Sequence, residues 1–309
     1  MAIGEITTDL KRTLLEAIGR SSYKGLLFSG GLDTSILAVA KPEIISITVS
    51  LESEAEDIRY AEFLAKSLDM EHFHRRVEID EAIEAIPEVI RTLKSFDPAI
   101  PNDLVIYFAL KSAKELGIDR IATGDGSDEL FAGYLFMQDI DDLETYISRL
   151  TKKMHFNSNV FGEFFKIEIL QPFITKEIID LVLQIPSDLK IREYNGKIWG
   201  KWILRKAFEE LLPESIIWQE KRVIEYGSGM SKLRKIISDR VTDREFRRES
   251  SFIKFINKEH LYYYKIYREV VGEIPQAKED QKICSACKAG VDFLDFHCRI
   301  CGNILDYQK

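Results

Sequence analysis

The seven residues at 29–35 (SGGLDTS) carry the groups expected of a loop that binds phosphate. Its paired glycines allow a tight turn and let the backbone approach a ligand without a Cβ in the way. The amides that follow open a predicted helix, whose N-terminus favours an anion, and three hydroxyl side chains add donors. Asp33 fits an anion site when a cation accompanies the phosphates, and Mg²⁺ commonly binds a carboxylate beside phosphates. The alternative, a glycine turn capped by serine, is disfavoured by the strand–helix setting.

A second acidic segment at 124–134 (GDGSDELFAGY) follows a predicted strand at 120–123. Ligands bind at the carboxyl ends of strands in parallel sheets. Asp128 and Asp33 are therefore predicted to converge on one Mg²⁺ between the phosphates. A structural role is compatible with this one, with Ser127 as a helix cap and acidic residues in the first turn.

All four cysteines of the chain form two CxxC pairs near its C-terminus: Cys284, Cys287, Cys298 and Cys301. This clustering indicates a metal site, because the bridges of a disulfide framework are distributed over a fold. Four thiolates complete a closed tetrahedral zinc site, and zinc binding explains how so short a tail could fold. Iron bound as in rubredoxin is the alternative. The tail could bind a partner, a carrier protein or RNA, or brace the C-terminus.

The histidines are not predicted to bind metal. His297 lies beside a cysteine pair, but four sulfurs already complete the site. The others lack metal-ligand spacing and are predicted to lie on the surface: His72, His74, His155 and His260.

The hydrophobic pattern predicts the elements that position these residues. Apolar periodicity indicates an N-terminal helix, and short runs between helical patterns indicate strands at 25–28, 44–49, 71–78 and 120–123, of which 44–49 is rich in β-branched residues. Helices are predicted between these strands, which implies an α/β fold with a parallel, doubly wound sheet covered on both faces. From about residue 139 the pattern is helical, with helices predicted at 139–150, 176–184 and 198–212, and no internal repeat is present.

Four parts are predicted along the chain. They are an N-terminal helix at 1–19, the main domain at 20–240, a helical and linker segment at 241–280, and the cysteine tail at 281–309. The linker includes GEIPQAKEDQK.

Composition limits the classes of protein to consider. The 309 residues are 45% hydrophobic and 30% charged, as in a globular protein. A net charge of −8 disfavours a large surface for nucleic acid. No window approaches 18 consecutive apolar residues and no secretory signal is evident, so a cytoplasmic protein without membrane partners is expected.

The phosphate loop resembles that of the PP-loop ATP pyrophosphatases, which cleave ATP between its α and β phosphates. It also resembles the loop of argininosuccinate synthetase, whereas a Walker loop would need a lysine after its last glycine. The segment at 124–134 is similar to one in the synthetase domain of asparagine synthetase and its relatives, such as the β-lactam-forming synthetases. This resemblance continues in order from about residue 20 to 235 through 169–174 (ILQPFI), 211–213 (LLP), Trp218, Lys221, Arg222 and 227–229 (GSG). The tail resembles a zinc ribbon.

The resemblance implies a fold of the adenine nucleotide alpha hydrolase type and a role for each matching residue. Lys221 and Asp125 fall on catalytic positions, where Lys221 would neutralise charge on the α-phosphate as pyrophosphate departs. Asp33 and Asp128 would bind Mg²⁺. ATP would be held by Leu27 and Val49 at the adenine, by Gly124 near the ribose and α-phosphate, and by Ser29, Gly30, Gly31, Asp33, Thr34 and Ser35 at the phosphates.

Three departures from that family concern its substrates. Asp125 stands where the best-known members have glutamate. The segment at 99–103 (AIPND) aligns with an aspartate-binding segment but lacks its threonines and arginine, and asparagine cannot replace the charged arginine fork. Aspartate is therefore doubtful as the substrate. The first cysteine is Cys284, so the N-terminal cysteine of a glutaminase domain has no counterpart, and nitrogen is expected from ammonia, a separate glutaminase or another amine.

The predicted function is that of an ATP-dependent ligase. It would adenylate a free or carrier-borne carboxylate for attack by ammonia or an amine, releasing AMP and pyrophosphate. One alternative is a PP-loop enzyme that modifies tRNA and uses the tail to grip RNA, although such thiolases commonly need core cysteines. Another is a non-catalytic nucleotide-binding scaffold, although a scaffold need not keep Asp33, Asp128 and Lys221 together.

Overall fold

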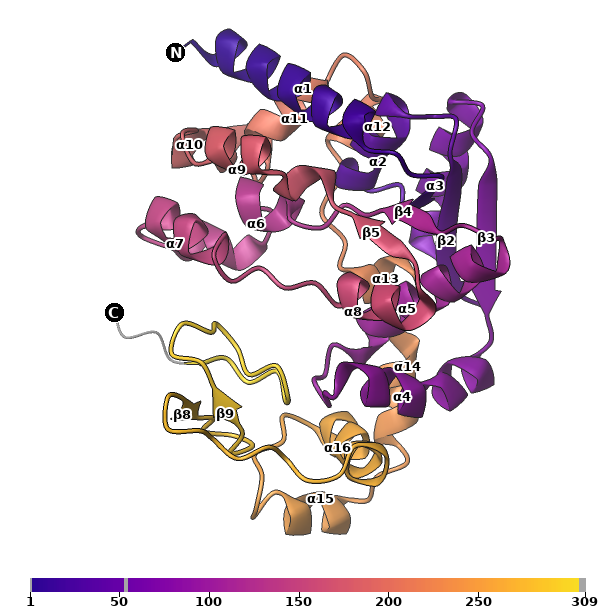
Figure 1. Ribbon diagram of the computed structural model, residues 1–309, viewed down its shortest axis with the longest axis vertical. Coiled ribbons are helices and arrows are strands. Elements are labelled where there is room, and N and C mark those ends of the chain that lie inside the picture. Colours follow the sequence, from indigo (N-terminus) through magenta and orange to yellow (C-terminus); the bar gives the residue numbers. More distant parts are fainter. Residues whose placement is uncertain (1, 53–54, 306–309) are drawn as a thin grey trace. The chain divides into compact units, whose positions relative to one another are not determined.

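The structure, a computed structural model, describes residues 2–52 and 55–305 of the chain (Figure 1). These residues form two compact units. The first unit comprises residues 1–49, 56–75 and 109–223. The second unit comprises residues 50–55, 76–108 and 224–309, which include the cysteine tail. The predicted domain boundaries remain predictions.

A five-stranded sheet has the order β3-β2-β1-β4-β5. Its strands are β1 (Gly25–Leu27), β2 (Ile45–Leu51), β3 (His72–Val77), β4 (Arg120–Ala122) and β5 (Glu168–Leu170). β1 pairs in parallel with both β2 and β4, and β4 pairs in parallel with β5. Along the chain, β2 and then β3 are added on one side of β1, and β4 and then β5 are added on its other side. The predicted parallel, doubly wound sheet is confirmed, and its switch point lies between β1 and β4.

Helices of the first unit connect and cover these strands (Figure 1). They are α1 (Ile3–Arg20), α2 (Leu32–Ala40), α3 (Glu56–Ser67), α6 (Ser127–Phe131), α7 (Leu143–Leu150), α8 (Asn157–Phe165), α9 (Lys176–Val182), α10 (Ser187–Lys190), α11 (Trp202–Phe208) and α12 (Glu214–Ile217), with the 3-10 turns η1 (Leu135–Asp139) and η2 (Pro172–Ile174). The predicted N-terminal helix is confirmed. Leu10, Leu14 and Ile18 of α1 are fully buried, and α1 packs against α11, α9 and α2.

The prediction of an all-helical second half is wrong in two places. Residues 168–170 form β5, the fifth strand of the sheet, and β6 (Arg192–Tyr194) pairs with β7 (Lys197–Trp199) as an antiparallel hairpin. These strands have three residues each, which is too short for an alternating pattern to appear in the sequence. The last predicted helix, at 198–212, therefore begins four residues later, with α11 at Trp202.

The second unit contains helices and a small hairpin. Its helices are α4 (Ile79–Leu93), α13 (Ile224–Gly227), α14 (Lys232–Ser238), α15 (Asp243–Glu249) and α16 (Lys258–Val270), and α5 (Ile100–Glu115) contributes residues to both units. The core of the second unit forms where α16 packs against α4 and α14. β8 (Lys282–Ile283) and β9 (Gly290–Val291) pair in the cysteine tail. Among the helices of the described residues, none is long and apolar enough to cross a bilayer.

His260 corrects the prediction that the histidines lie on the surface. It is buried in α16 between the rings of Phe96 and Phe255, with ring centroids 5.3 and 5.4 Å away. Its Nδ1 accepts a hydrogen bond from the Ile256 amide at 3.2 Å. Burial lowers the pKa of His260 to about 4, so the imidazole is neutral in the folded protein.

Replacing His260 with asparagine is expected to reduce the loss of unfolding free energy that occurs as the pH falls below neutral. The unfolded state protonates His260 below about pH 6.5 and the folded state only below about pH 4. Stability is therefore lost as the pH falls through this window, by about 3 kcal/mol in total for this residue. The side-chain oxygen of the introduced asparagine can still accept from the Ile256 amide but does not titrate. Urea unfolding at pH 4.5 and 7 measures the difference; equal pH dependence in both proteins would contradict the assignment.

Candidate functional site

The predicted phosphate loop lies at the carboxyl end of β1, at the switch point of the sheet. Gly30 has a φ of +67° and packs so closely on α3 that a Cβ would lie 2.5 Å from the Ala61 nitrogen. Only glycine satisfies both conditions. Gly31 is the N-cap of α2, so the amides of the first helical turn follow directly and have no intrahelical acceptors.

The hydroxyl groups of this loop are weakly held. Ser29 Oγ accepts from the Gly31 amide at 3.2 Å, and Thr34 Oγ1 lies 3.4 Å from Ser29 Oγ. Ser35 Oγ is buried and has no hydrogen-bond partner among the described residues. These distances are long for hydrogen bonds to hydroxyl oxygens. An anion could therefore take over these donors at small cost.

Asp33 and Asp128 meet at a lysine that the sequence patterns did not reveal. Lys201 Nζ lies 2.6 Å from Asp33 Oδ2 and 2.7 Å from Asp128 Oδ1. Lys221 Nζ lies 2.6 Å from the other oxygen of Asp128. The structure thus brings together Asp33, Asp128 and Lys221, which are far apart in the sequence, and Lys201 joins the two carboxylates.

The charges of this cluster stabilise one another. Burial alone would raise the pKa of Asp128, but the charges of Lys201 and Lys221 outweigh it and lower the pKa to about 2. Burial would likewise lower the pKa of Lys201, but Asp128 and Asp33 outweigh it and raise the pKa. Asp128 and Lys201 are therefore ionised at neutral pH. Their mutual dependence makes the cluster sensitive to the loss of any one charge.

Two glycines allow Lys201 to reach this position. A Cβ on Gly133 would lie 1.9 Å from Asp128 Oδ1 and 2.2 Å from Lys201 Cε. A Cβ on Gly200 would lie 2.3 Å from the Ala132 carbonyl oxygen. Lys201 itself adopts a left-handed backbone (φ +56°) immediately before α11. A sequence signal was present, because Gly200 interrupts the pattern from which a helix was predicted.

A buried network connects the phosphate loop to the segment that carries Lys221. Arg205 of α11 donates to the carbonyls of Gly200, Ile217 and Gln219. Gln219 in turn donates to the Gly30 carbonyl at 2.8 Å. Burial lowers the pKa of Arg205 to about 10, so the guanidinium remains charged at neutral pH. Arg205 therefore positions Lys221 relative to the loop without joining the charge cluster.

Replacing Arg205 with lysine is expected to destabilise the first unit by about 2 kcal/mol, because a compact ammonium lacks the separate nitrogens with which the guanidinium reaches these carbonyls. Chemical denaturation measures the change. Arg205 lies over the Trp199 ring, with its guanidinium 4.8 Å from the ring centroid. Arg192→Lys is the matched control, because the Arg192 guanidinium lies over the Trp202 ring at a similar distance, 4.7 Å. Equal effects of the two substitutions would mean that the carbonyl contacts of Arg205 add nothing.

Asp125 lies apart from the charge cluster in its hydrogen bonding. Its Oδ2 accepts from Thr123 at 2.6 Å, Ser158 at 2.5 Å and Gln171 at 2.9 Å. Ser158 and Gln171 were not singled out as functional from the sequence, although Gln171 belongs to the ILQPFI segment. Three donors therefore hold Oδ2 of Asp125 in place.

The remaining predicted residues of the site fall into three groups. Ser127 is not the helix cap that was predicted; the N-cap is Gly126, and the Ser127 hydroxyl donates to Asp33 at 2.7 Å. Gly124 abuts the loop, where a Cβ would lie 3.0 Å from Asp33 Cβ. Leu27 ends β1 and Val49 is buried in β2, and their contact with adenine remains a prediction.

The acidic residues offer oxygen ligands suited to Mg²⁺. Asp128 Oδ1 is buried and lies 2.7 Å from Lys201 Nζ, so this oxygen already faces a positive charge. A carboxylate oxygen in this condition is suited to a cation, and Mg²⁺ prefers one or two carboxylates together with phosphates. The donor set therefore fits the predicted ion.

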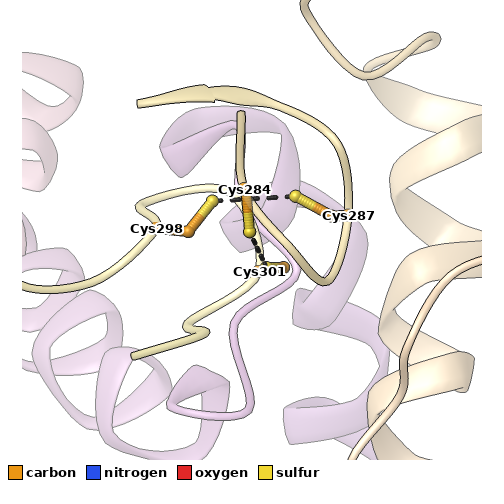
Figure 2. Close-up of side chains that lie close together, drawn as sticks. All are labelled: Cys284, Cys287, Cys298 and Cys301. Carbon is orange, nitrogen blue, oxygen red and sulfur yellow. Dashed lines mark hydrogen bonds between the residues drawn. The ribbon is translucent and has the colours of Figure 1, made fainter. Parts of the chain in front are cut away.

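The four cysteine side chains of the tail point toward one another (Figure 2). Their sulfurs lie within 4.8 Å of each other, with Cys284 3.8 Å from Cys301 and Cys287 3.6 Å from Cys298. All four side chains are buried, and none forms a disulfide. A tetrahedral ion with Zn–S bonds of about 2.3 Å requires sulfur–sulfur distances of roughly 3.8 Å. The cluster therefore has the dimensions of a four-thiolate metal site.

The chain is similar in sequence to known asparagine synthetases. The chain is 28% identical over 286 residues to probable asparagine synthetase [glutamine-hydrolyzing] of Dictyostelium discoideum, covering 80% of this chain and 51% of that protein. It is 28% identical over 304 residues to asparagine synthetase B of Escherichia coli, covering 86% and 54%. The chain thus spans about half the length of these curated relatives.

A solved structure, the NH3-dependent NAD synthetase of Campylobacter jejuni, is 14% identical and covers 90% of this chain and 100% of that one, with a TM-score of 0.38. The family model for asparagine synthase matches residues 20–163 and 163–283, most of the chain. The chain therefore belongs to the asparagine synthase family.

Proposed function

We propose that this protein is an ATP-dependent ligase that adenylates a carboxylate and transfers the acyl group to ammonia or an amine. The observation that carries the proposal is the convergence of Asp33, Asp128 and Lys221 at Lys201, beside a glycine loop at the switch point of the sheet. Membership of the asparagine synthase family supports the same reaction class. In this proposal, Leu27 and Val49 contact adenine and Gly124 lies near the ribose.

In the first step, a carboxylate oxygen of the substrate attacks the α-phosphorus of ATP. The bond from that phosphorus to the α,β-bridging oxygen breaks, and its electron pair leaves with pyrophosphate. The loop at 29–35 holds the β and γ phosphates through its amides and hydroxyls. Asp33 and Asp128 would hold Mg²⁺, which would supply positive charge to the phosphates. Lys221 and Lys201 stabilise the negative charge that develops as pyrophosphate departs.

In the second step, the nitrogen attacks the acyl carbon and AMP leaves with its bond electrons. The attacking nitrogen must lose a proton, and Asp125 is the acceptor we propose. Thr123, Ser158 and Gln171 fix its Oδ2, so Oδ1 is the oxygen that can take the proton. Asp125 stands where the best-known relatives have the longer glutamate, so its carboxylate lies one methylene closer to the main chain.

Exchange of labelled pyrophosphate into ATP tests the proposal. The full-length protein is assayed with Mg²⁺ and, in separate reactions, with free amino acids and dicarboxylates, acyl carrier proteins and tRNA. Exchange that depends on an acid, together with a hydroxamate formed when hydroxylamine is added, is the expected result. Exchange that requires tRNA alone would instead indicate an RNA-modifying enzyme. Tight ATP binding without exchange under any condition would indicate a scaffold.

The nitrogen source is tested once an acid is found. We propose that ammonia, an amine or a separate glutaminase supplies it, so product should form with ammonium salts or an added amine. We propose that glutamine alone supports no turnover by these 309 residues, whose first cysteine is Cys284 of the tail. Product formed from glutamine alone would contradict this part of the proposal.

A further inference from the structure

The second cysteine knuckle of the tail, residues 298–302, is bound to a turn at residues 95–99 of the same unit. The Ile300 carbonyl accepts a hydrogen bond from the Phe96 amide at 2.7 Å and from the Ser95 hydroxyl at 3.2 Å. Ile300 lies between the two cysteines of its CxxC pair. A metal bound by Cys298 and Cys301 would therefore fix the position of Ile300, whose carbonyl holds the turn.

Comparison of the first knuckle, residues 284–288, with the second shows why residue 302 is glycine. The contact with the 95–99 turn requires glycine there, and the backbone conformation of the knuckle does not. In the first knuckle the Lys288 amide donates to the Cys284 carbonyl, and in the second the Gly302 amide donates to the Cys298 carbonyl. Both donors have left-handed backbones, with φ values of +69° and +72°. Lysine is thus compatible with this conformation in the first knuckle.

Gly302 differs from Lys288 in what it faces. A Cβ at Gly302 would lie 2.5 Å from Asp97 Oδ1. Asp97 cannot move aside without loss, because the same oxygen accepts from the Ala99 amide at 2.9 Å. The missing side chain at 302 thus lets the knuckle approach the turn closely.

The turn is held from its other side by an aromatic cluster. Phe96 is fully buried, and its ring lies 5.2 Å from the rings of both Tyr264 and Tyr267 of α16. The Asp97 carbonyl accepts from the Ile100 amide at the start of α5. The backbone contacts with the knuckle and the packing of Phe96 together set where α5 begins.

We infer that a metal ion in the four-cysteine site, zinc by the chemistry of its ligands, anchors the 95–99 turn and thereby the start of α5. The tail is an internal brace of the second unit, and not a free docking module for RNA or a carrier protein. The coupling is reciprocal, so the turn also retains the metal. One consequence rests on the proposed function: residues 99–103, which align with the acid-binding segment of the family, would be ordered by the metal.

Hydrogen exchange and metal release test this coupling in the full-length protein. Peptides covering residues 95–103 are expected to exchange at least about tenfold faster after zinc is removed by a chelator, while α1 is unchanged. Gly302→Ala keeps all four cysteines and should still bind one zinc ion per chain. It should release zinc to a chromogenic chelator about tenfold faster, as for other changes next to metal ligands, and show raised exchange at 95–103.

Two controls separate the contact from backbone strain. Lys288→Ala alters the equivalent position of the first knuckle and should behave as the wild type. Gly117→Ala introduces the same strain at a φ of +71°, with no atom within 4 Å of the added Cβ, and should leave zinc release unchanged. If Gly302→Ala fails to fold, Ser95→Ala removes one donor to Ile300 and should accelerate release about threefold.

The inference is overturned if the wild type binds no zinc, or if exchange at 95–103 is the same with and without it. It also fails if the metal-loaded tail binds tRNA while residues 95–103 remain unprotected. These measurements do not depend on catalysis. The protein could show the expected zinc release and hydrogen exchange but no pyrophosphate exchange. That result would contradict the proposed function and still support the role of the metal in anchoring the 95–99 turn.

Discussion

Replacement of Lys201 by methionine is expected to reduce pyrophosphate exchange by about 10²–10³-fold, the usual effect of removing one preorganised charge from a transition state. Methionine preserves length and apolar packing but removes the ammonium that contacts Asp33 and Asp128. The two partly buried carboxylates then lie close together without the cation that they share. The folded protein should lose about 3–5 kcal/mol of stability in the absence of Mg²⁺.

Magnesium provides a second readout for this variant. Because the cation can replace the missing ammonium between the carboxylates, Mg²⁺ should raise the melting temperature of Lys201→Met more than that of the wild type. Lys206→Met is the matched control, since Lys206 lies in α11, which begins directly after Lys201, and pairs with Glu209 outside the charge cluster. Exchange within threefold of the wild type would show that Lys201 has no part in the reaction.

Replacement of Asp128 by asparagine is expected to reduce exchange by a similar factor, about 10²–10³-fold. The side chain keeps its shape, but it no longer neutralises Lys201 and Lys221 and is a poorer ligand for Mg²⁺. Its effect should appear as a higher Mg²⁺ concentration for half-maximal exchange, which a structural role would not produce. Exchange measured across a Mg²⁺ titration gives both quantities.

Asp142→Asn is the control for this substitution. Asp142 caps α7 by accepting from the Thr145 amide at 3.0 Å, a role that asparagine fills equally well. It should leave both the rate and the Mg²⁺ requirement unchanged. An Asp128→Asn enzyme with wild-type exchange would remove this residue from the metal site.

Much of the charge cluster could be predicted from local patterns. The loop at 29–35 and the segment at 124–134 each follow a strand, and the carboxyl ends of adjacent parallel strands lie together. Asp33 and Asp128 were predicted to converge for that reason, and the structure brings them to one lysine nitrogen. The sheet followed from the same alternation of strands and helices.

Lys201 could not be predicted in the same way. It lies within a pattern typical of a helix, and its position depends on close backbone contacts at Gly133 and Gly200, which are long-range packing features. The burial of His260 and the contact of Gly302 with Asp97 are also consequences of tertiary structure. A short strand such as β5 has too few residues to leave a periodic signal.

The bond of ATP that is broken tests the central claim most directly. The wild-type protein, with its acid substrate and Mg²⁺, is given ATP analogues with a methylene group in place of either the α,β- or the β,γ-bridging oxygen, and products are followed by ³¹P NMR. The geometry predicts that the β,γ-methylene analogue is consumed, releasing AMP or its acyl derivative and methylenediphosphonate, while the α,β-methylene analogue is inert. Release of orthophosphate from the α,β-methylene analogue, with the β,γ-methylene analogue untouched, would contradict the account.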